Sequence, residues 1–431
     1  MKAAFYSLGC KVNSYETEVL INMFIKAGYE IVDFDDIADI YVINTCSVTN
    51  TSDQKSRKII REASKKNKDA IICVMGCYSQ LNSDITKDLG DNIAIILGTN
   101  NRSKLLDYIE EYKKNKKQII LINDLNKIAF ENMSLDKFEN HTRAFVKIQD
   151  GCNNYCSYCI IPYTRGNVRS KKKEDVIEEL TSLANNNYKE VVLTGIHTGH
   201  YGQDLKDYDF SDLLNEIEKI DGIERIRISS IEITELNDKF LDVLRKSKKI
   251  VNHIHIPIQS LCDKTLKEMN RKYDVKYFFD KINKIREIRP NIAITSDVIV
   301  GFPGETDNDF NITKENITKL GITELHVFPY SRRKGTPADL MPNQIDGNIK
   351  KKRVKELINL SEELKNKFYR SIIGQNEQLL SEKYIDGYLI GHLSNYGLCK
   401  VKTDDKKLNE IINVKLIDYI DDCFIGEIIK K

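Results

Sequence analysis

The sequence predicts an α/β protein built from three units, and three observations support this prediction. The chain has 431 residues, which is long for one hydrophobic core and suggests about three domains at roughly 150 residues each. Short apolar runs alternate with helical patterns through most of the chain, which is typical of parallel sheets covered by helices. After Gly374 the pattern changes to short strands separated by turns, which favours a small β-barrel.

The first unit, residues 1–113, is expected to be a doubly wound parallel α/β domain. Its first helix is indicated by Asn13 as an N-terminal cap, by Glu16 three residues later and by an apolar face that follows. Gly28 marks the end of that helix. The apolar runs predict strands at 3–8, 41–43, 70–74 and 93–97.

Three cysteines of this unit follow predicted strands: Cys10, Cys46 and Cys77. Because the carboxyl ends of parallel strands meet at one edge of a sheet, we expect the three thiols to converge there and to bind a metal centre. The alternative is that they are ordinary buried cysteines, since free cysteine is among the most buried residue types. We interpret Cys73, which lies inside a strand, in that second way.

The second unit, residues 138–368, follows a polar connector at 113–141 and is expected to form a partial (βα)6 barrel. Polar residues at the carboxyl ends of its strands are candidates for ligand binding. The alternative for any single one is a turn or a helix cap. The predicted strands lie at 145–148, 190–194, 225–229, 253–258, 292–300 and 324–328.

Within the second unit, Cys152, Cys156 and Cys159 form a C-x3-C-x2-C triplet. Structural zinc takes four ligands, usually from paired Cys-x2-Cys knuckles, and no second knuckle follows here. Iron-sulfur clusters take thiolates from closely spaced cysteines in a loop, and three thiolates leave one iron of a four-iron cluster open. The triplet therefore favours an iron-sulfur centre over the alternative of three cysteines that share a structural loop by accident.

The third unit, residues 370–431, is expected to form the small β-barrel after a charged helix at 349–370. We expect Cys399 and Cys423 to belong to its core. The predicted strands lie at 378–381, 388–392, 398–401, 412–417 and 424–429.

Composition bears on the cellular compartment and the binding partners of the protein. Ten cysteines in a chain of this length are too few for a disulfide scaffold, and we expect neither a signal peptide nor a membrane span. These features predict a reducing cytoplasm. The net charge of +2 does not by itself indicate a nucleic-acid binder.

Taken together, these motifs resemble the radical S-adenosylmethionine (SAM) methylthiotransferase family over nearly the whole chain. The resemblance implies an N-terminal domain with an auxiliary cluster, a radical-SAM barrel as the core, and a C-terminal OB-like RNA-binding barrel of the TRAM type. The matching runs lie at 7–13, 44–49, 75–78, 150–166, 297–306 and 326–331.

The resemblance also implies two 4Fe-4S clusters and SAM as cofactors, with the two cysteine triplets as cluster ligands and no further catalytic residue. A 5′-deoxyadenosyl radical would remove hydrogen from C2 of an adenine, and the auxiliary cluster would present the sulfur. The residues expected to contact SAM are Tyr158, Thr194, Gly195, Ser229, Glu232 and Gln259.

The run Cys10-Lys11-Val12-Asn13 is similar to the bacterial branch that acts on N6-threonylcarbamoyladenosine at tRNA position 37, next to the anticodon. The branch acting on isopentenyladenosine typically has Cys-Gln-Met-Asn there, and the branch modifying a ribosomal protein has Cys-Pro-Lys-Asn. The alternatives are methylthiolation of another tRNA adenosine or a ribosomal protein, and a non-catalytic iron-sulfur RNA-binding protein. A radical enzyme whose N-terminal cluster only relays electrons is a further possibility.

The expected partners are the tRNA anticodon loop and an electron donor such as flavodoxin or ferredoxin, with the enzyme a monomer away from membranes. From Ser371 onward the chain has eight Lys or Arg and ten Asp or Glu, so phosphate contacts must come from a local face. We expect that face at 351–355 together with Arg332, Arg333 and Lys334. Leu261-Cys262 stands where the family commonly has glycine, and Cys262 is interpreted as a packed or incidental thiol, with an extra cluster ligand as the alternative.

Overall fold

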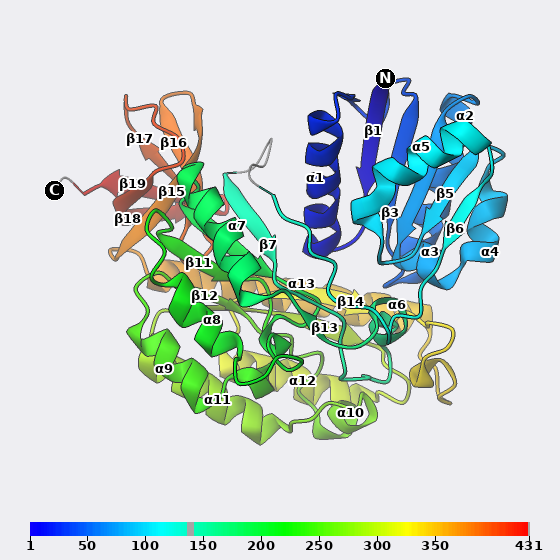
Figure 1. Ribbon diagram of the computed structural model, residues 1–431. Helices are drawn as coiled ribbons and strands as arrows, with labels where there is room; N and C mark the ends of the chain where they lie inside the picture. Colours follow the sequence, from blue (N-terminus) through cyan, green and yellow to red (C-terminus); the bar gives the residue numbers. More distant parts are fainter. Residues whose placement is uncertain (136–141, 430–431) are drawn as a thin grey trace.

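The computed structural model describes residues 1–135 and 142–429 and arranges them as three units (Figure 1). The expected start of the second unit at residue 138 lies outside the described residues. A six-stranded sheet, an open barrel of parallel strands and a closed barrel follow one another along the chain. The α/β class predicted from the sequence is confirmed.

The first unit is a parallel sheet in the order β2-β1-β3-β4-β5-β6. Its central strands are buried along their whole length because helices pack on both faces, with α1 and α5 on one side and α2 on the other. The strands are β1 Lys2–Ser7, β2 Glu30–Val32, β3 Ile40–Thr45, β4 Ile71–Gly76, β5 Ile93–Leu97 and β6 Ile119–Leu121. The helices are α1 Lys11–Lys26, α2 Asn50–Lys66, α3 Cys77–Leu81, α4 Ser83–Thr86 and α5 Leu105–Asn115.

Helix α1 begins earlier than the sequence predicted, and the predicted cap is wrong. Cys10 occupies the N-cap position, so Asn13 lies inside the first turn. The Asn13 amide donates hydrogen bonds to the carbonyl oxygens of Leu8 (2.6 Å) and Thr45 (3.1 Å). Asn13 therefore ties the helix start to two strand ends instead of capping its own helix.

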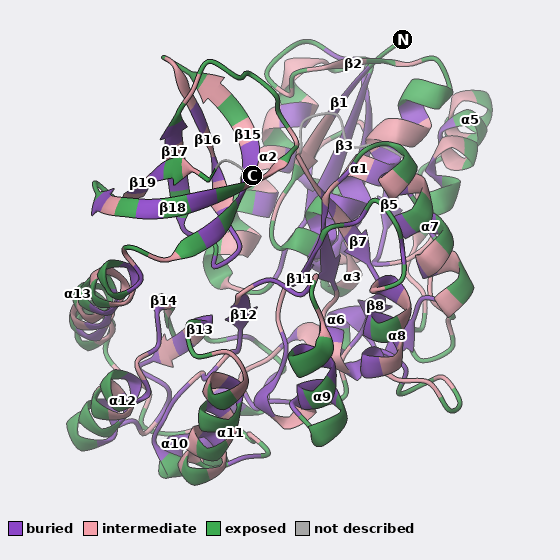
Figure 2. Ribbon diagram, turned by 90° about the vertical axis from the view of Figure 1, so that its left-hand side faces the viewer, coloured by how far each residue is buried: buried purple, intermediate pink, exposed green. Residues whose placement is uncertain are grey.

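The second unit is an open barrel in which β11-β10-β7 and β12-β13-β14 are joined by a bridge between Ile226 and Ile250. Helices cover its outside, and the strands form the buried interior (Figures 1 and 2). The strands are β7 Arg143–Lys147, β10 Glu190–Thr194, β11 Arg225–Ile228, β12 His253–His255, β13 Ala293–Val300 and β14 Glu324–Pro329, with the short pair β8 Gln149–Asp150 and β9 Arg169–Ser170. The helices are α6 Ile161–Arg165, α7 Lys173–Asn185, α8 Phe210–Ile217, α9 Asp238–Lys246, α10 Asp263–Glu268, α11 Val275–Ile288, α12 Asp307–Leu320 and α13 Gly347–Ser371.

The third unit is a closed five-stranded barrel in the order β15-β16-β17-β19-β18. Cys399 is in its core, whereas Cys423 is only half-buried, so the prediction for Cys423 is wrong. Tyr369 and Ile372, at the end of α13, pack into this core and join the barrel to the second unit. The strands are β15 Asn376–Ile385, β16 Tyr388–Leu393, β17 Leu398–Lys402, β18 Ile411–Ile420 and β19 Cys423–Ile428.

A buried ion cluster joins the first two units. The fully buried Glu16 carboxylate lies 2.7 Å from Lys147 Nζ, 2.7 Å from Arg165 Nη1 and 3.0 Å from Arg102 Nη1. Burial raises the pKa of Glu16, but these three cations outweigh burial and bring the pKa down to about 2. Glu16 is therefore ionised at neutral pH and has several partners across the junction.

Arg333, which the sequence analysis assigned to RNA docking, also links the first two units. The Arg333 side chain is buried, lies 2.9 Å from Asp53 Oδ2 and donates to the Asn50 Oδ1 and Ser47 Oγ atoms, both at 2.8 Å. Its guanidinium is thus already engaged between two units. The expectation that Arg333 contacts tRNA phosphate is wrong for this physical reason.

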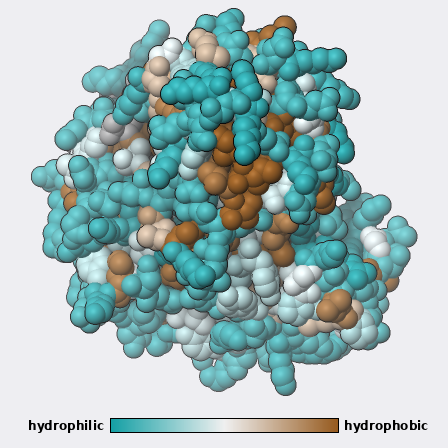
Figure 3. All heavy atoms as spheres, turned by 45° about the vertical axis from the view of Figure 1, so that its right-hand side comes forward, coloured by the Kyte–Doolittle hydropathy of each residue, from teal (hydrophilic) through white to brown (hydrophobic). Residues whose placement is uncertain are grey.

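Across the described ranges, no helix has both the length and the apolar character needed to cross a membrane. The face seen in Figure 3 is mainly hydrophilic, and most of its apolar side chains gather in one patch near the centre of the view.

Candidate active site

Cys10, Cys46 and Cys77 lie at one edge of the six-stranded sheet. The register pairs Ser7 with Asn44 and Thr45 with Gly76, so the residues that follow β1, β3 and β4 emerge together. A Cβ atom at Gly9 would stand 2.9 Å from Cys46 Sγ, which shows how closely the β1 end approaches this thiol. The convergence expected from strand order is present in the geometry.

The electrostatics of this triplet suit a metal centre. Burial, together with the neighbouring Cys77 and Cys10, raises the pKa of Cys46 to about 11. Without a metal ion, such a thiol stays protonated at neutral pH, whereas a metal ion displaces the proton and holds the thiolate. The guanidinium of Arg165 interacts electrostatically with Cys10 and Cys77 and offsets negative charge there. The residues present therefore fit an iron-sulfur cluster.

Cys152, Cys156 and Cys159 lie in the loop between β8 and α6. The Cys159 amide donates to the Cys156 carbonyl oxygen at 3.0 Å, and the Cys152 amide donates to that of Gly166 at 3.0 Å, which closes the loop. Burial raises the pKa of Cys159, and the neighbouring Cys156 adds to this effect. The Arg271 guanidinium lies 3.4 Å from Cys156 Sγ and supplies a compensating cation. This triplet also fits an iron-sulfur cluster.

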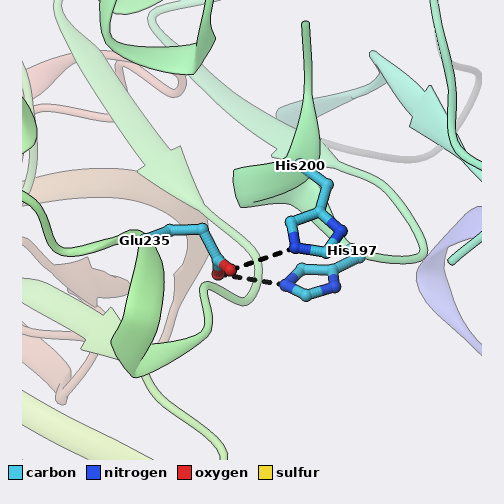
Figure 4. Close-up of side chains that lie close together, drawn as sticks. All are labelled: His197, His200 and Glu235. Carbon is cyan, nitrogen blue, oxygen red and sulfur yellow. Dashed lines mark hydrogen bonds and ion pairs between the residues drawn. The ribbon is translucent and has the colours of Figure 1, made fainter. Parts of the chain in front are cut away.

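Two histidines and a glutamate lie beside this loop, and the sequence prediction missed them (Figure 4). His197 Nδ1 is 3.6 Å from Cys152 Sγ, and its Nε2 is 3.0 Å from Glu235 Oε2. His200 Nε2 lies 3.2 Å from Glu235 Oε1, and the two imidazole rings stack with centroids 3.5 Å apart. Burial lowers the pKa of His197, but its hydrogen bonds to Cys152 and Glu235 outweigh burial and raise the pKa to about 10.

An imidazolium at His197 donates from both ring nitrogens, so one N–H points at Cys152 and the other at Glu235. This orients the ring toward a predicted cluster ligand. The signal in the sequence was the pair His197 and His200 just after the β10 strand. That signal was weak, because the decisive partner, Glu235, lies on another βα unit.

A cavity of about 560 Å³ opens between the three units. Three of the predicted SAM contacts, Thr194, Gly195 and Ser229, line it together with Cys10. The other walls come from the ends of β11 to β14, from Lys11 and Val12 at the start of α1, and from Tyr396 in the turn between β16 and β17. A cysteine of the first triplet and the strand ends of the second unit therefore line the same cavity.

The remaining predicted SAM contacts are not among the residues that line this cavity in the described part of the chain. Glu232 binds the Arg271 guanidinium with both carboxylate oxygens. Tyr158 Oη lies 3.5 Å from Arg271 Nη1, so Tyr158 and Glu232 meet at the same arginine beside the cluster loop. Gln259, at φ +56°, accepts a backbone bond from Ile299 and donates one to Asp297, both at 2.9 Å.

Leu261-Cys262, where the resemblance led us to expect glycine, is accommodated by packing. Leu261 is fully buried, and the Cys262 thiol lies 3.5 Å from Asp309 Oδ1. Cys262 is a packed thiol, as the sequence predicted.

Comparison with protein families gives two matches. The radical SAM superfamily matches residues 146–317, and the uncharacterized protein family UPF0004 matches residues 2–98. The first match contains the C-x3-C-x2-C loop, and the second contains Cys10, Cys46 and Cys77.

Several curated proteins are similar over nearly their full length. A Bacillus subtilis (strain 168) protein named threonylcarbamoyladenosine tRNA methylthiotransferase MtaB is 45% identical over 422 residues, covering 96% of this chain and 93% of the relative. An Aquifex aeolicus protein of the same name is 38% identical, covering 90% and 96%. A Clostridium botulinum (strain Loch Maree) protein named tRNA-2-methylthio-N(6)-dimethylallyladenosine synthase is 34% identical, covering 97% and 95%.

Among solved structures, the radical SAM methyltransferase TsrM from Kitasatospora setae superposes with a TM-score of 0.58 at 14% identity, covering 79% of this chain and 77% of that one. At this identity the likeness supports the fold alone.

Proposed function

We infer that this chain, which belongs to the radical SAM methylthiotransferase family, transfers a methylthio group to C2 of N6-threonylcarbamoyladenosine at tRNA position 37. The observation that supports this most directly is the 45% identity, over 96% of the chain, to a protein named for that substrate. The geometry agrees with it, because Cys10, Thr194 and Ser229 line the same cavity.

The two cysteine triplets are the proposed holders of two 4Fe-4S clusters. When bound, the clusters and SAM supply electrons, a 5′-deoxyadenosyl radical and sulfur; the protein supplies position and charge. Arg271 and His197 offset the negative charge of the Cys152 loop, and Arg165 does so beside Cys10. The hydrogen on an adenine C2 is not acidic, so no side-chain base is needed to remove it as a proton.

We assign Thr194, Gly195 and Ser229 to direct SAM contact, because they line the cavity. Tyr158 and Glu232 act through Arg271, which both of them contact. Gln259 contributes through its backbone hydrogen bonds to β13, which fix the conformation of the chain that follows β12.

For tRNA docking, the third unit offers an OB-like barrel, a fold that binds single-stranded nucleic acid. Lys351, Lys352 and Lys355 are exposed on α13, which leads directly into that barrel. Phosphate contacts from these lysines would bring the anticodon loop toward the cavity. An electron donor such as flavodoxin or ferredoxin would serve a monomeric enzyme in the cytoplasm.

The second candidate substrate is N6-dimethylallyladenosine, favoured by the 34% identity to the Clostridium botulinum protein. Reconstituted enzyme would be incubated anaerobically with SAM, a reductant and tRNA carrying either modification, and the nucleosides would be separated by mass spectrometry. We expect the methylthio product from the threonylcarbamoyl tRNA alone. Product from the dimethylallyl tRNA alone would contradict the proposal.

The same incubation separates catalysis from a purely structural role of the clusters. Release of methionine and 5′-deoxyadenosine is expected from a radical SAM enzyme. Its absence from protein loaded with both clusters would instead support a non-catalytic RNA-binding protein.

A further inference from the structure

One corner of the cavity is cationic and incompletely paired, and all three units contribute to it. We call it the Lys11 corner; it consists of Lys11, Arg227, His253 and Tyr396, all of which line the cavity. Lys11 is the first residue of α1 and directly follows Cys10. Among the described residues, its ammonium makes no hydrogen bond or ion pair. Lys11 is thus a cation on the cavity wall that forms no salt bridge with a described residue, although Asp297 interacts with it electrostatically.

The neighbouring Arg227 is only partly neutralised. Its Nε lies 2.7 Å from Glu190 Oε1, but the same carboxylate also serves Arg225 at 3.1 Å. The Arg227 Nη atoms have only distant contacts, at 3.5 Å, to the carbonyl oxygens of Leu393 and Ser394. Two guanidinium groups sharing one carboxylate leave a surplus of positive charge beside Lys11.

His253 supplies an unused polar atom in the same corner. Its side chain is buried and its Nε2 lies 3.0 Å from Thr295 Oγ1, whereas Nδ1 has no hydrogen-bond partner within the described ranges. A buried polar atom left unpaired is costly, and this one belongs to a residue that lines the cavity, so a ligand group that pairs with His253 would be favoured there.

Tyr396, from the third unit, contacts both His253 and Arg227. Its ring stacks on His253 with centroids 5.2 Å apart, and the Arg227 guanidinium lies 4.7 Å above it. Tyr396 adopts φ +75°, a strained conformation for a tyrosine, which the surrounding contacts maintain. The barrel thus completes a wall that the other two units leave open.

The cavity is also lined by two carboxylates, those of Asp297 and Glu324. Asp297 on β13 is 3.2 Å from His326 Nδ1 and 3.4 Å from His255 Nε2, and Glu324 is on the adjacent β14. Asp297 interacts electrostatically with Lys11 but forms its ion pairs with the two histidines. Because two histidines offset the charge of Asp297, an anionic ligand group is attracted to the Lys11 corner, where Lys11 has no ion-pair partner among the described residues.

We propose that the Lys11 corner binds the carboxylate of the threonyl group on N6 of the substrate adenosine and thereby selects this substrate over one with an apolar N6 group. The inference rests on the proposed function. C2 and N6 lie on the same edge of adenine, on either side of N1. A base whose C2 faces Cys10 therefore directs its N6 substituent to the adjoining wall, where Lys11 is the next residue.

The chemistry of the corner explains why the selection is strong. A carboxylate pairs with the ammonium of Lys11 and with nearby N–H donors, which matches a threonyl group. A dimethylallyl group in the same place displaces water from Lys11 but has no hydrogen-bond acceptor for the ammonium. Burial of the unpaired charge is costly. Discrimination thus comes both from attraction of one substrate and from rejection of the other.

The test measures binding of anticodon stem-loops to the cluster-loaded enzyme without reductant. The stem-loops carry threonylcarbamoyladenosine, unmodified adenosine or dimethylallyladenosine at position 37, and fluorescence anisotropy gives the affinities. We expect the wild type to bind the threonylcarbamoyl form about tenfold or more tighter than the unmodified form, and Lys11→Met to bring that ratio close to one. Lys11→Arg should keep most of the preference, because the charge remains.

Two controls make the result specific. Lys55→Met removes an exposed lysine from α2 of the same unit and should leave the ratio unchanged. A stem-loop whose threonyl carboxylate is converted to a methyl ester should bind the wild type like the unmodified form. This second control needs no protein variant, so it holds even if Lys11→Met disturbs the neighbouring cluster.

Three outcomes would overturn the inference. The preference could survive in Lys11→Met and with the ester. Lys11→Met could weaken all three stem-loops equally, which would assign Lys11 to a backbone phosphate. It could also weaken SAM binding in the absence of RNA, which would assign Lys11 to the cofactor. Mass spectrometry of wild-type reactions distinguishes failure of this inference from failure of the proposed function. If the wild type forms product from the threonylcarbamoyl stem-loop but Lys11→Met binds the stem-loops with an unchanged preference, the inference alone is refuted. If the wild type forms no product, the proposed function is refuted as well.

Discussion

At the scale of single residues, the first turn of α1 shows where sequence reasoning misread local chemistry. Asn13 and Glu16 have the spacing of a capping pair, yet both bind Arg165, at 2.6 Å from Asn13 Oδ1 and 2.7 Å from Glu16 Oε1. Arg165 is about 150 residues away in the chain, so no local pattern identifies it. The cysteine ligand candidates were predictable because spacing and strand ends alone locate them.

The buried Glu16 carboxylate gives the first prediction. Glu16→Gln should lower the free energy of unfolding by about 3–5 kcal/mol, because it leaves Lys147, Arg165 and Arg102 without their shared partner. The matched control is Glu62→Gln, which breaks the exposed pair with Lys58 and should cost at most about 0.5 kcal/mol. Chemical denaturation followed by circular dichroism measures both, and equal effects would contradict the role given to Glu16.

The pKa of Glu16 adds a pH dependence to this prediction. The folded-state pKa of about 2 lies below the ordinary value of 4.5. As pH falls, the unfolded chain therefore binds the proton first, so this stabilisation is complete above about pH 4.5 and is lost as pH falls toward about 2. The stability difference between wild type and Glu16→Gln should shrink over that window, and a difference independent of pH would contradict the assignment.

The two cysteine triplets give the second prediction. Cys156→Ala should abolish release of 5′-deoxyadenosine, because it removes a ligand from the loop of the second unit. Cys46→Ala should retain that release and lose the methylthio product. Chromatography of SAM products and of nucleosides measures both. Equal loss of SAM cleavage in the two variants, with the other cluster intact by iron analysis, would refute the division of labour.

At the scale of elements, strands with a clear apolar pattern were predictable, and short edge strands were not. The sequence located β10 at its observed bounds and found the five barrel strands, because alternating or continuous apolar runs identify them. It missed β2 and β6, which are three residues each and lie at the two edges of the first sheet. Edge strands this short are formed by pairing with β1 and β5, so their own composition carries little signal.

The junction of β4 and α3 gives the third prediction. Gly76 has φ +103°, and a Cβ there would stand 2.4 Å from the Thr45 carbonyl oxygen. Gly76→Ala should therefore displace Cys77 and halve the iron bound per chain, while SAM cleavage persists. The control is Gly28→Ala, with φ +84° and no atom within 4 Å of the added Cβ, which should cost about 1 kcal/mol and bind iron normally. Full iron content in Gly76→Ala would contradict the role of this turn.

At the scale of the whole molecule, all three units contribute residues to the cavity. Cys10 and Lys11 come from the first unit, the strand ends from the second and Tyr396 from the third. Sequence reasoning found the strand-end residues because a barrel presents them in order, but it could not place Tyr396 against Arg227. It also assigned Arg333 to RNA, whereas the assembled molecule uses that side chain between its units.

The correction for Arg333 shifts the expected RNA surface to α13 and gives the fourth prediction. Charge reversal of the exposed residues Lys351 and Lys352 should weaken tRNA binding and reduce the slope of log affinity against log salt by about one per lost contact. Arg333→Ala should instead lower stability, because it removes the ion pair with Asp53 and the hydrogen bonds to Asn50 and Ser47 across the junction. Unchanged affinity and slope in the lysine variant would exclude this surface.

The most direct test of the proposed function is mass spectrometry of tRNA nucleosides from cells with and without this gene. We predict that deletion removes the methylthio form of threonylcarbamoyladenosine alone, that the wild-type gene restores it and that the Cys46→Ala gene does not. An unchanged nucleoside profile after deletion, or loss of the methylthio form of dimethylallyladenosine instead, would contradict the proposed function.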